Sequence, residues 1–206
     1  MERKKKVDSA VTFTPPVVSR TIKFYNQHQG PYGCFSNFSG HPVNLEGEVW
    51  PTTEHYYQAK KFLDPLIQAH IRACETPMKA KRMAYDRSLP VRKDWECVKE
   101  MVMITALRAK FSQHASLQQA LVSTEDALLV EHTKNDSYWA DGGNGSGKNR
   151  LGHLLMQVRQ ELQQQRKRKL TAEEAQAAPA KKRQEVETIK QLLEQDEIFR
   201  AVFNEN

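Results

Sequence analysis

Residues 135–152 read NDSYWADGGNGSGKNRLG, and this segment combines acidic, aromatic, glycine and basic residues in a way that ordinary protein core does not. Residues 142–148 match the G-x-x-x-x-G-K spacing of a nucleotide-triphosphatase phosphate loop. The next position is Asn149, where such a loop needs Ser or Thr to hold Mg²⁺. Residues 134–137 are polar, whereas a phosphate loop follows a buried apolar strand. These two departures argue against a phosphate-loop protein.

The same segment is rich in glycine and basic side chains, which suits a bound anion. Glycine permits positive φ and lets backbone N–H groups approach an anion closely. The glycines in question are Gly142, Gly143, Gly145 and Gly147. Lys148 and Arg150 add positive charge at the start of a predicted helix. We expect the loop to bind phosphate, and the alternative is that its glycines only form a turn.

The composition is that of a folded protein with excess positive charge. The 206 residues suffice for one compact domain plus a tail, 39% of them are hydrophobic, and the formal net charge is +6. This charge suits a polyanionic ligand such as a phosphorylated sugar or nucleic acid. No apolar run approaches the roughly 18 residues of a membrane span, and the N-terminus lacks a signal peptide. We therefore expect an intracellular protein without a membrane partner, and we favour a monomer.

Cysteine and histidine spacing indicates neither a disulfide framework nor a metal site. The three cysteines, Cys34, Cys74 and Cys97, are widely spaced. The seven histidines show no H-E-x-x-H pattern or comparable ligand spacing. We expect reduced thiols, no metal and no cofactor.

Helical patterns follow one another through the middle of the chain. Thr53 can cap a first helix, and Asp64 and Thr76 each precede a proline at a first helical position. The expected helices run over 53–63, from 65, from 77, and over 94–111, 116–122 and 149–165.

Strand patterns are fewer and cluster near the start. Alternation predicts a strand over 21–25 and a hairpin over 42–50, and another strand is expected over 127–132. Early strands, central helices and one late strand differ from alternating βαβ units. The pattern favours an α+β fold, a mainly helical single domain around a small β-sheet.

Both ends of the chain differ from this central part. Residues 1–19 are basic and then Thr/Pro-rich, and we interpret them as a flexible leader before a catalytic domain at 20–162. Residues 163–206 are interpreted as a basic linker followed by an amphipathic helix over 186–203. Basic clusters between Arg166 and Arg183 resemble a bipartite nuclear-import signal, although they also fit a solvated linker. The protein is therefore expected in the nucleus or the cytoplasm.

A polar stripe on the helix predicted from Thr53 is the first candidate for chemistry. Glu54, Gln58 and Lys61 share one helical face, and Tyr57 borders it. Such a stripe is usually the solvent face of a helix. The Phe35–Phe38 segment and Trp95 add hydroxyl, amide and aromatic groups, which together can hold a phosphorylated sugar and a flat base.

Several motifs, in this order, resemble the NADAR family of N-glycosidases. They are FSNF at 35–38, WPTTEHYYQAKKF at 50–62, T-P-x-x-A-K-x-M at 76–83, VRKDWECVKEMVM at 91–103, and the segment from 135 onward. The resemblance covers about residues 20–162 and implies a NADAR-like fold. It does not extend to the leader or the tail.

The resemblance implies hydrolysis of a bond between ribose C1′ and an amine on a heterocycle, the ribose carrying a 5′-phosphate or diphosphate. Two substrate classes go with the family: guanine bearing ADP-ribose in DNA or RNA, and phosphoribosylamino-pyrimidinone intermediates of riboflavin synthesis. The basic charge favours the first. A third possibility is a module that binds ADP-ribose or NAD without turnover.

Roles for individual residues are carried over from the same resemblance. Glu54 and Asp141 are expected at the reaction centre as acid and base, in an order left open, with Trp95 beside them. Asp136 could replace Asp141 as the working carboxylate. Lys61 is expected to anchor phosphate, or else to attack an opened sugar aldehyde.

The remaining expected contacts are with substrate. Asn37, Gln58 and Asn149 are assigned to sugar hydroxyls, and the 142–148 backbone with Arg150 to phosphate. The other expected substrate-binding residues are Ser36, Phe38, Tyr57, Tyr138, Trp139 and Gly152.

Overall fold

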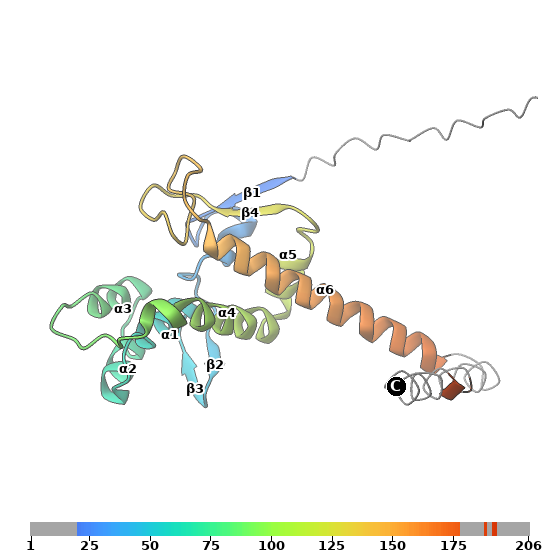
Figure 1. Ribbon diagram of the computed structural model, residues 1–206, viewed down its shortest axis with the longest axis horizontal. Helices are drawn as coiled ribbons and strands as arrows, with labels where there is room; N and C mark the ends of the chain where they lie inside the picture. Colours follow the sequence, from blue (N-terminus) through green and yellow to red (C-terminus); the bar gives the residue numbers. More distant parts are fainter. Residues whose placement is uncertain (1–19, 178–187, 189–190, 193–206) are drawn as a thin grey trace, which may run out of the picture.

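Helices dominate the computed structural model, which describes residues 20–177, 188 and 191–192 (Figure 1). The strands are β1 (Thr21–Phe24), β2 (Val43–Leu45), β3 (Glu48–Trp50) and β4 (Leu128–Glu131), and a 3₁₀ helix, η1, covers Gly30–Phe35. The helices are α1 (Thr53–Ala59), α2 (Pro65–Arg72), α3 (Pro77–Ala84), α4 (Trp95–Gln113), α5 (Ala115–Val122) and α6 (Arg150–Ala177). The predicted α+β class is confirmed. The predicted leader lies outside the described residues.

The strands form two separate pairs instead of the single small sheet that was expected. β1 and β4 are parallel, with Phe24 opposite Glu131, whereas β2 and β3 form the predicted antiparallel hairpin. The central helix α4 explains the separation. It packs Leu107 into a core shared with β1, β4 and α6, and Ala106 into a second core shared with β2, β3 and α1. Figure 1 shows α4 between the two pairs.

Helix caps explain where α1, α2 and α3 begin. Asp64 accepts a hydrogen bond from Leu66 N, and Thr76 from Lys79 N, so both predicted caps are confirmed. The predicted cap of α1 is wrong by one residue, because Thr52 accepts the bond from His55 N. α1 also ends at Ala59, before the predicted Leu63, and all of its residues are buried. The polar stripe on α1 is therefore not a solvent face.

α6 is longer than its apolar pattern indicates. The helix was expected to end near residue 165, shortly after its last core residue, Leu162. It continues to Ala177, because 163–177 contains only helix-forming and neutral residues before Pro179. The first basic cluster, 166–169, is exposed on this helix. The second basic cluster, and the predicted amphipathic helix apart from isolated positions, lie outside the described residues.

No helix in the described part of the chain is long and apolar enough to cross a lipid bilayer.

Candidate active site

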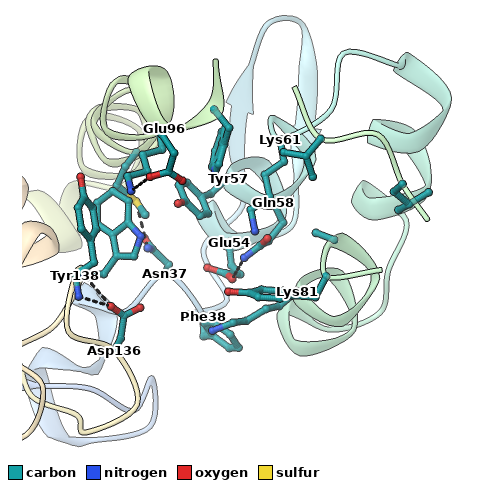
Figure 2. A pocket seen from close by; sticks show the side chains of 18 of the residues that line it. Asn37, Phe38, Glu54, Tyr57, Gln58, Lys61, Lys81, Glu96, Asp136 and Tyr138 are labelled. Atoms are coloured by element: carbon teal, nitrogen blue, oxygen red, sulfur yellow. Dashed lines mark hydrogen bonds and ion pairs between the residues drawn. The ribbon is translucent and has the colours of Figure 1, made fainter. Parts of the chain in front are cut away.

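The main pocket lies between α1, α3, the start of α4 and the loops that follow η1 and precede α6 (Figure 2). Its volume of about 650 Å³ is in the range of small-molecule sites. Much of the predicted site lines it, namely Ser36, Asn37, Phe38, Glu54, Tyr57, Gln58, Lys61, Trp95, Asp136, Tyr138 and Trp139. The fold thus brings together residues as far apart in the sequence as Ser36 and Trp139.

Glu54 is the buried acidic group of the main pocket, with 5% of its surface exposed. Gln58, one turn further along α1, donates from Nε2 to Glu54 Oε1 at 2.6 Å. Burial raises the pKa of Glu54, whereas the Gln58 hydrogen bond and the positive charges of Lys81 and Lys61 act in the opposite direction. In Figure 2 the carboxylate lies between these two lysines. The site holds a carboxyl away from water yet beside groups that favour its charged form.

Gln58 and Asn37, both expected to bind sugar hydroxyls, differ in their remaining hydrogen-bonding capacity. Gln58 Oε1 is buried and accepts no hydrogen bond from the described residues. Such an acceptor costs about 1–3 kcal/mol, which a substrate hydroxyl can offset. Asn37 donates from Nδ2 to Met103 Sδ at 3.2 Å and accepts at Oδ1 from Thr53 Oγ1 at 3.0 Å. Asn37 therefore holds the start of α1 in place, while Gln58 keeps an acceptor for ligand.

Aromatic rings form one continuous wall of the main pocket. The Tyr57 ring centroid lies 5.1 Å from that of Trp95 and 5.5 Å from that of Trp139. Tyr138 extends the series, 5.1 Å from Trp139. Both tryptophans singled out in the sequence therefore face the same space, where they can stack on a flat ring and exclude water.

Lys61 follows α1 and points its ammonium group at aromatic rings. Nζ lies 4.5 Å from the Tyr85 ring centroid and 6.0 Å from that of Trp95. No described residue hydrogen-bonds to this nitrogen. Burial lowers the pKa of Lys61, and the charge of Glu54 partly opposes that effect. Lys61 is thus a half-buried amine without a carboxylate partner.

Asp136, unlike Asp141, lines the main pocket, as does Asp86 in the loop between α3 and α4. Asp136 Oδ1 accepts hydrogen bonds from Tyr138 N at 2.8 Å and Trp139 N at 2.7 Å, which fixes the loop carrying the two rings. No described residue donates to its other oxygen, Oδ2. The sequence had offered Asp136 as the alternative to Asp141, and the placement favours this alternative.

Asp141 does not line the main pocket, which corrects its predicted placement beside Glu54 and Trp95. His132 Nδ1 donates to Asp141 Oδ2 at 2.7 Å, and Gly143 N donates to Oδ1 at 2.8 Å. Although burial alone favours the neutral acid, these hydrogen bonds hold the pKa of Asp141 below its usual value. Both carboxylate oxygens are therefore engaged in positioning the loop.

The predicted phosphate cradle at 142–148 is also corrected. Gly142 N donates to Asp136 O, Gly143 N to the Asp141 carboxylate, and Gly145 N and Gly147 N both to Asp141 O. These N–H groups are used inside the loop, and none of the four glycines lines the main pocket. A Cβ at Gly147 would lie 2.4 Å from Ala140 O. The glycines make a tight turn, the alternative that the sequence had left open.

Arg150 and Lys148, expected to contact phosphate, lie outside the lining of the main pocket. Arg150 donates to both oxygens of Glu100 on α4, each at 2.7 Å, and this pairing lowers the pKa of Glu100 to about 2. Tyr138 Oη donates to the same carboxylate at 2.6 Å. Lys148 is exposed, with Nζ 5.3 Å from the Tyr138 ring centroid. The Arg150 charge is thus paired with Glu100, and this ion pair anchors the loop to α4.

Asn149 and Gly152, also expected at the substrate, instead join α6 to β4. Asn149 accepts at Oδ1 from Glu131 N at 3.0 Å and donates from Nδ2 to Leu129 O at 2.8 Å. A Cβ at Gly152 would lie 2.1 Å from the same Leu129 oxygen, so only glycine allows this approach. Neither residue lines the main pocket.

Glu131 lines the main pocket but was missed in the sequence, where it was only part of a predicted strand. It is the last residue of β4, and its backbone O accepts from Asp141 N at 2.9 Å. Burial, with further contributions from the carboxylates of Asp136 and Glu54, raises the pKa of Glu131 to about 8. An acidic residue at the end of an otherwise apolar strand was the available signal.

Basic residues of the main pocket were missed as well. Lys81 on α3 lies 5.8 Å from the Phe38 ring centroid and near Glu54, and Arg87 and Lys99 line the pocket too. Lys81 belongs to the T-P-x-x-A-K-x-M motif, so its position was noted without a role. Within the described residues, no group of three or more His, Cys, Asp or Glu side chains could hold a metal ion.

Comparison with known proteins identifies a family to which this chain is similar. A family model described as the NADAR domain matches residues 23–163. N-glycosidase YbiA of Escherichia coli is 57% identical over 141 residues, which cover 68% of this chain and 88% of that protein. A riboflavin biosynthesis protein of Vibrio vulnificus is 37% identical over 72% of this chain and 40% of its own length.

A solved structure agrees with this match. The NMR structure of E. coli YbiA superposes with a TM-score of 0.67 at 54% sequence identity, covering 73% of this chain and 89% of the other. The shared region includes every element that lines the main pocket.

Proposed function

The chain belongs to the NADAR domain family and is an N-glycosidase, and from this premise we propose that it removes ADP-ribose from guanine bases in DNA or RNA. The bond that breaks joins ribose C1′ to an amine of the base. The oxygen of water bonds to C1′, and the departing amine takes up a proton. The products are ADP-ribose and unmodified guanine.

The observation that carries the proposal is the buried Glu54 carboxylate beside Lys61 and Lys81. Breaking the bond builds positive charge at C1′, which a carboxylate screened from water stabilises strongly. The amide of Gln58 fixes this carboxylate and leaves a free acceptor for a ribose hydroxyl. The two lysines supply positive charge for the phosphate oxygens of the same substrate.

The size and lining of the main pocket support a large substrate. Arg87 and Lys99 add cations beyond the two lysines at Glu54, although Lys99 pairs with Glu96, so Arg87 is the further cation offered to a diphosphate. The wall formed by Tyr57, Trp95 and Trp139 offers aromatic surface for a flat ring. The net charge of +6 further favours a nucleic acid partner.

Lys61 has two roles open to it in this reaction. As an ammonium it would hold phosphate, and as a neutral amine it would attack the C1′ aldehyde of the opened sugar, forming a Schiff base that water later hydrolyses. Amine attack requires a lowered pKa, and burial supplies one. The charges of Glu54 and Glu96 act against this lowering.

Turnover of two substrates tests the proposal. The protein is incubated with an oligonucleotide carrying ADP-ribosylated guanine and, separately, with a phosphoribosylamino-pyrimidinone. We expect release of ADP-ribose and repair of the oligonucleotide, followed by chromatography. Turnover of the small metabolite alone would contradict the proposal, and binding without turnover of either would favour a non-catalytic module.

A second candidate function is hydrolysis of the phosphoribosylamino-pyrimidinone intermediates of riboflavin synthesis. It is favoured by the name of the Vibrio vulnificus relative, a riboflavin biosynthesis protein. Both substrates carry ribose on an amine of an amino-pyrimidinone ring, so one pocket geometry can serve either. This chain matches 40% of that relative, which is therefore a larger protein with further parts.

Glu131 is our candidate for the proton donor to the departing amine. Its pKa of about 8 keeps it protonated at neutral pH. Burial raises the pKa of Glu54 too, but there Gln58, Lys81 and Lys61 all act in the opposite direction, whereas at Glu131 only Lys81 does. We expect kcat to fall above about pH 8 as Glu131 loses its proton. Glu131→Gln should lower kcat roughly a hundredfold and remove this alkaline decline. An unchanged decline in the variant would contradict the assignment.

Glu131→Gln should also change how the stability of the protein depends on pH. The folded-state pKa of Glu131 lies above the ordinary value of about 4.3, so the folded protein retains a proton that the unfolded chain loses. The resulting stabilisation is complete below about pH 4 and is lost as the pH rises through about 8. Glu131→Gln should therefore gain stability relative to the unsubstituted protein as the pH is raised, measured as unfolding temperature.

A further inference from the structure

A second pocket, of about 640 Å³, adjoins the main pocket. It lies between the segment that follows β1, the start of α3 and residues 133–136. The residues that line both pockets are Ser36, Phe38, Lys81, Glu131 and Asp136. Two acidic groups of the site, Glu131 and Asp136, thus line both pockets, whereas Glu54 lines only the main pocket.

Strand pairing places part of this shared lining. β1 and β4 run parallel with Phe24 opposite Glu131, and His132 N donates to Phe24 O at 2.9 Å. Tyr25, the next residue after β1, therefore emerges beside the end of β4. Asn135 Nδ2 approaches Tyr25 Oη at 3.5 Å across the same gap. Residues that follow the paired ends of β1 and β4 therefore line the second pocket together.

The two pockets differ in charge. The main pocket has the cations Lys61, Arg87 and Lys99 in addition to the shared Lys81, and it also has carboxylates of its own, those of Glu54, Asp86 and Glu96. The second pocket has no Lys, Arg, Asp or Glu other than the shared ones. Its own contributions include the half-exposed apolar side chains of Tyr25 (44%) and Met78 (47%). The amides of Asn26, Gln27 and Asn135 supply polar groups. Phosphate therefore fits the main pocket, and a neutral ring with polar edges fits the second.

We infer that the second pocket binds the amino-pyrimidinone ring of the departing base while the main pocket holds the phosphorylated ribose. This inference rests on the proposed N-glycosidase substrate and names where its two halves bind. The C1′–N bond then lies where the two pockets adjoin, beside the residues that line both. Glu131 stands there to give its proton to the amine that leaves into the second pocket, and Glu54 remains on the ribose side.

A matched pair of tryptophan substitutions tests the inference. Met78 and Leu66 each follow the proline that begins a helix, α3 and α2, and both are exposed, at 47% and 71%. Met78 lines the second pocket only, and Leu66 lines neither. Met78→Trp narrows the second pocket, and Leu66→Trp is the control. Ribose 5-phosphate and a diaminopyrimidinone are titrated separately by calorimetry into each protein.

Met78→Trp should weaken binding of the pyrimidinone at least about tenfold and leave ribose 5-phosphate within about twofold. Leu66→Trp should change neither. Unchanged pyrimidinone binding in Met78→Trp, equal loss of both ligands, or no pyrimidinone binding to the unsubstituted protein would overturn the inference. Because these are binding measurements, failure of turnover would count against the proposed function alone, and a retained split between the two ligands would still support two subsites.

Discussion

Glu54→Gln is expected to lower kcat about a thousandfold, the size of effect seen when a charge that stabilises a transition state is removed. The amide has nearly the shape of the carboxylate but cannot stabilise positive charge at C1′. Substrate affinity should change much less, because Lys61, Lys81 and the aromatic wall remain. Steady-state kinetics with the oligonucleotide substrate measure both quantities.

The fold should tolerate this substitution. Glu54 is a buried acid whose pKa is raised by burial, so a neutral side chain removes an electrostatic cost. Glu75→Gln is the control, since Glu75 is exposed, pairs only with Lys79 and lines neither pocket. A kcat within tenfold of the unsubstituted protein in Glu54→Gln would remove Glu54 from the reaction centre.

Gly152→Ala is expected to lower the free energy of unfolding by about 3 kcal/mol or more. In an ordinary helix the change from glycine to alanine stabilises by about 1 kcal/mol. Here the new Cβ would lie 2.1 Å from Leu129 O and about 2.5 Å from the Asn149 amide. Leu129 O belongs to the backbone of β4, and the Asn149 side chain is buried and hydrogen-bonded to that same oxygen. Neither can shift easily, so α6 must move away from β4.

Urea unfolding followed by circular dichroism measures this effect. Gly40→Ala is the matched control, because a Cβ at Gly40 meets nothing within 4 Å. It should unfold within about 0.5 kcal/mol of the unsubstituted protein. Equal stability of Gly152→Ala and Gly40→Ala would mean that the close approach of α6 to β4 is not needed for folding.

Local chemistry made part of the fold predictable. Asp64 and Thr76 each precede a proline, and that pattern places a helix start without tertiary information. The extension of α6 beyond Leu162 was missed because the apolar stripe ends there, although the helix-forming sequence continues. Two strand pairs were taken for one sheet because periodicity does not reveal that α4 separates them.

The candidate site likewise contains residues that could be predicted from the sequence and residues that could not. Glu54, Trp95 and Trp139 were identified by resemblance, and the fold brings them to one pocket. Asp141 and the glycine segment could not be placed, because glycine and acidic residues suit an anion site and a self-bonded turn equally well in sequence. Only the hydrogen bonds of the folded loop distinguish these cases. Glu131 was missed because strand pairing, not sequence spacing, puts it beside Glu54.

The complete burial of α1 determines where this enzyme can acquire new substrate preferences. Each residue from Thr53 to Ala59 packs against its surroundings, so a substitution there disturbs a core as well as the reacting carboxyl. The loop between α3 and α4 is different, because Tyr85 and Val91 line the same pocket with 65% and 44% of their surfaces exposed. Substitutions that change substrate selectivity, during evolution or in a laboratory library, should therefore destabilise the fold little in this exposed loop and much more in α1.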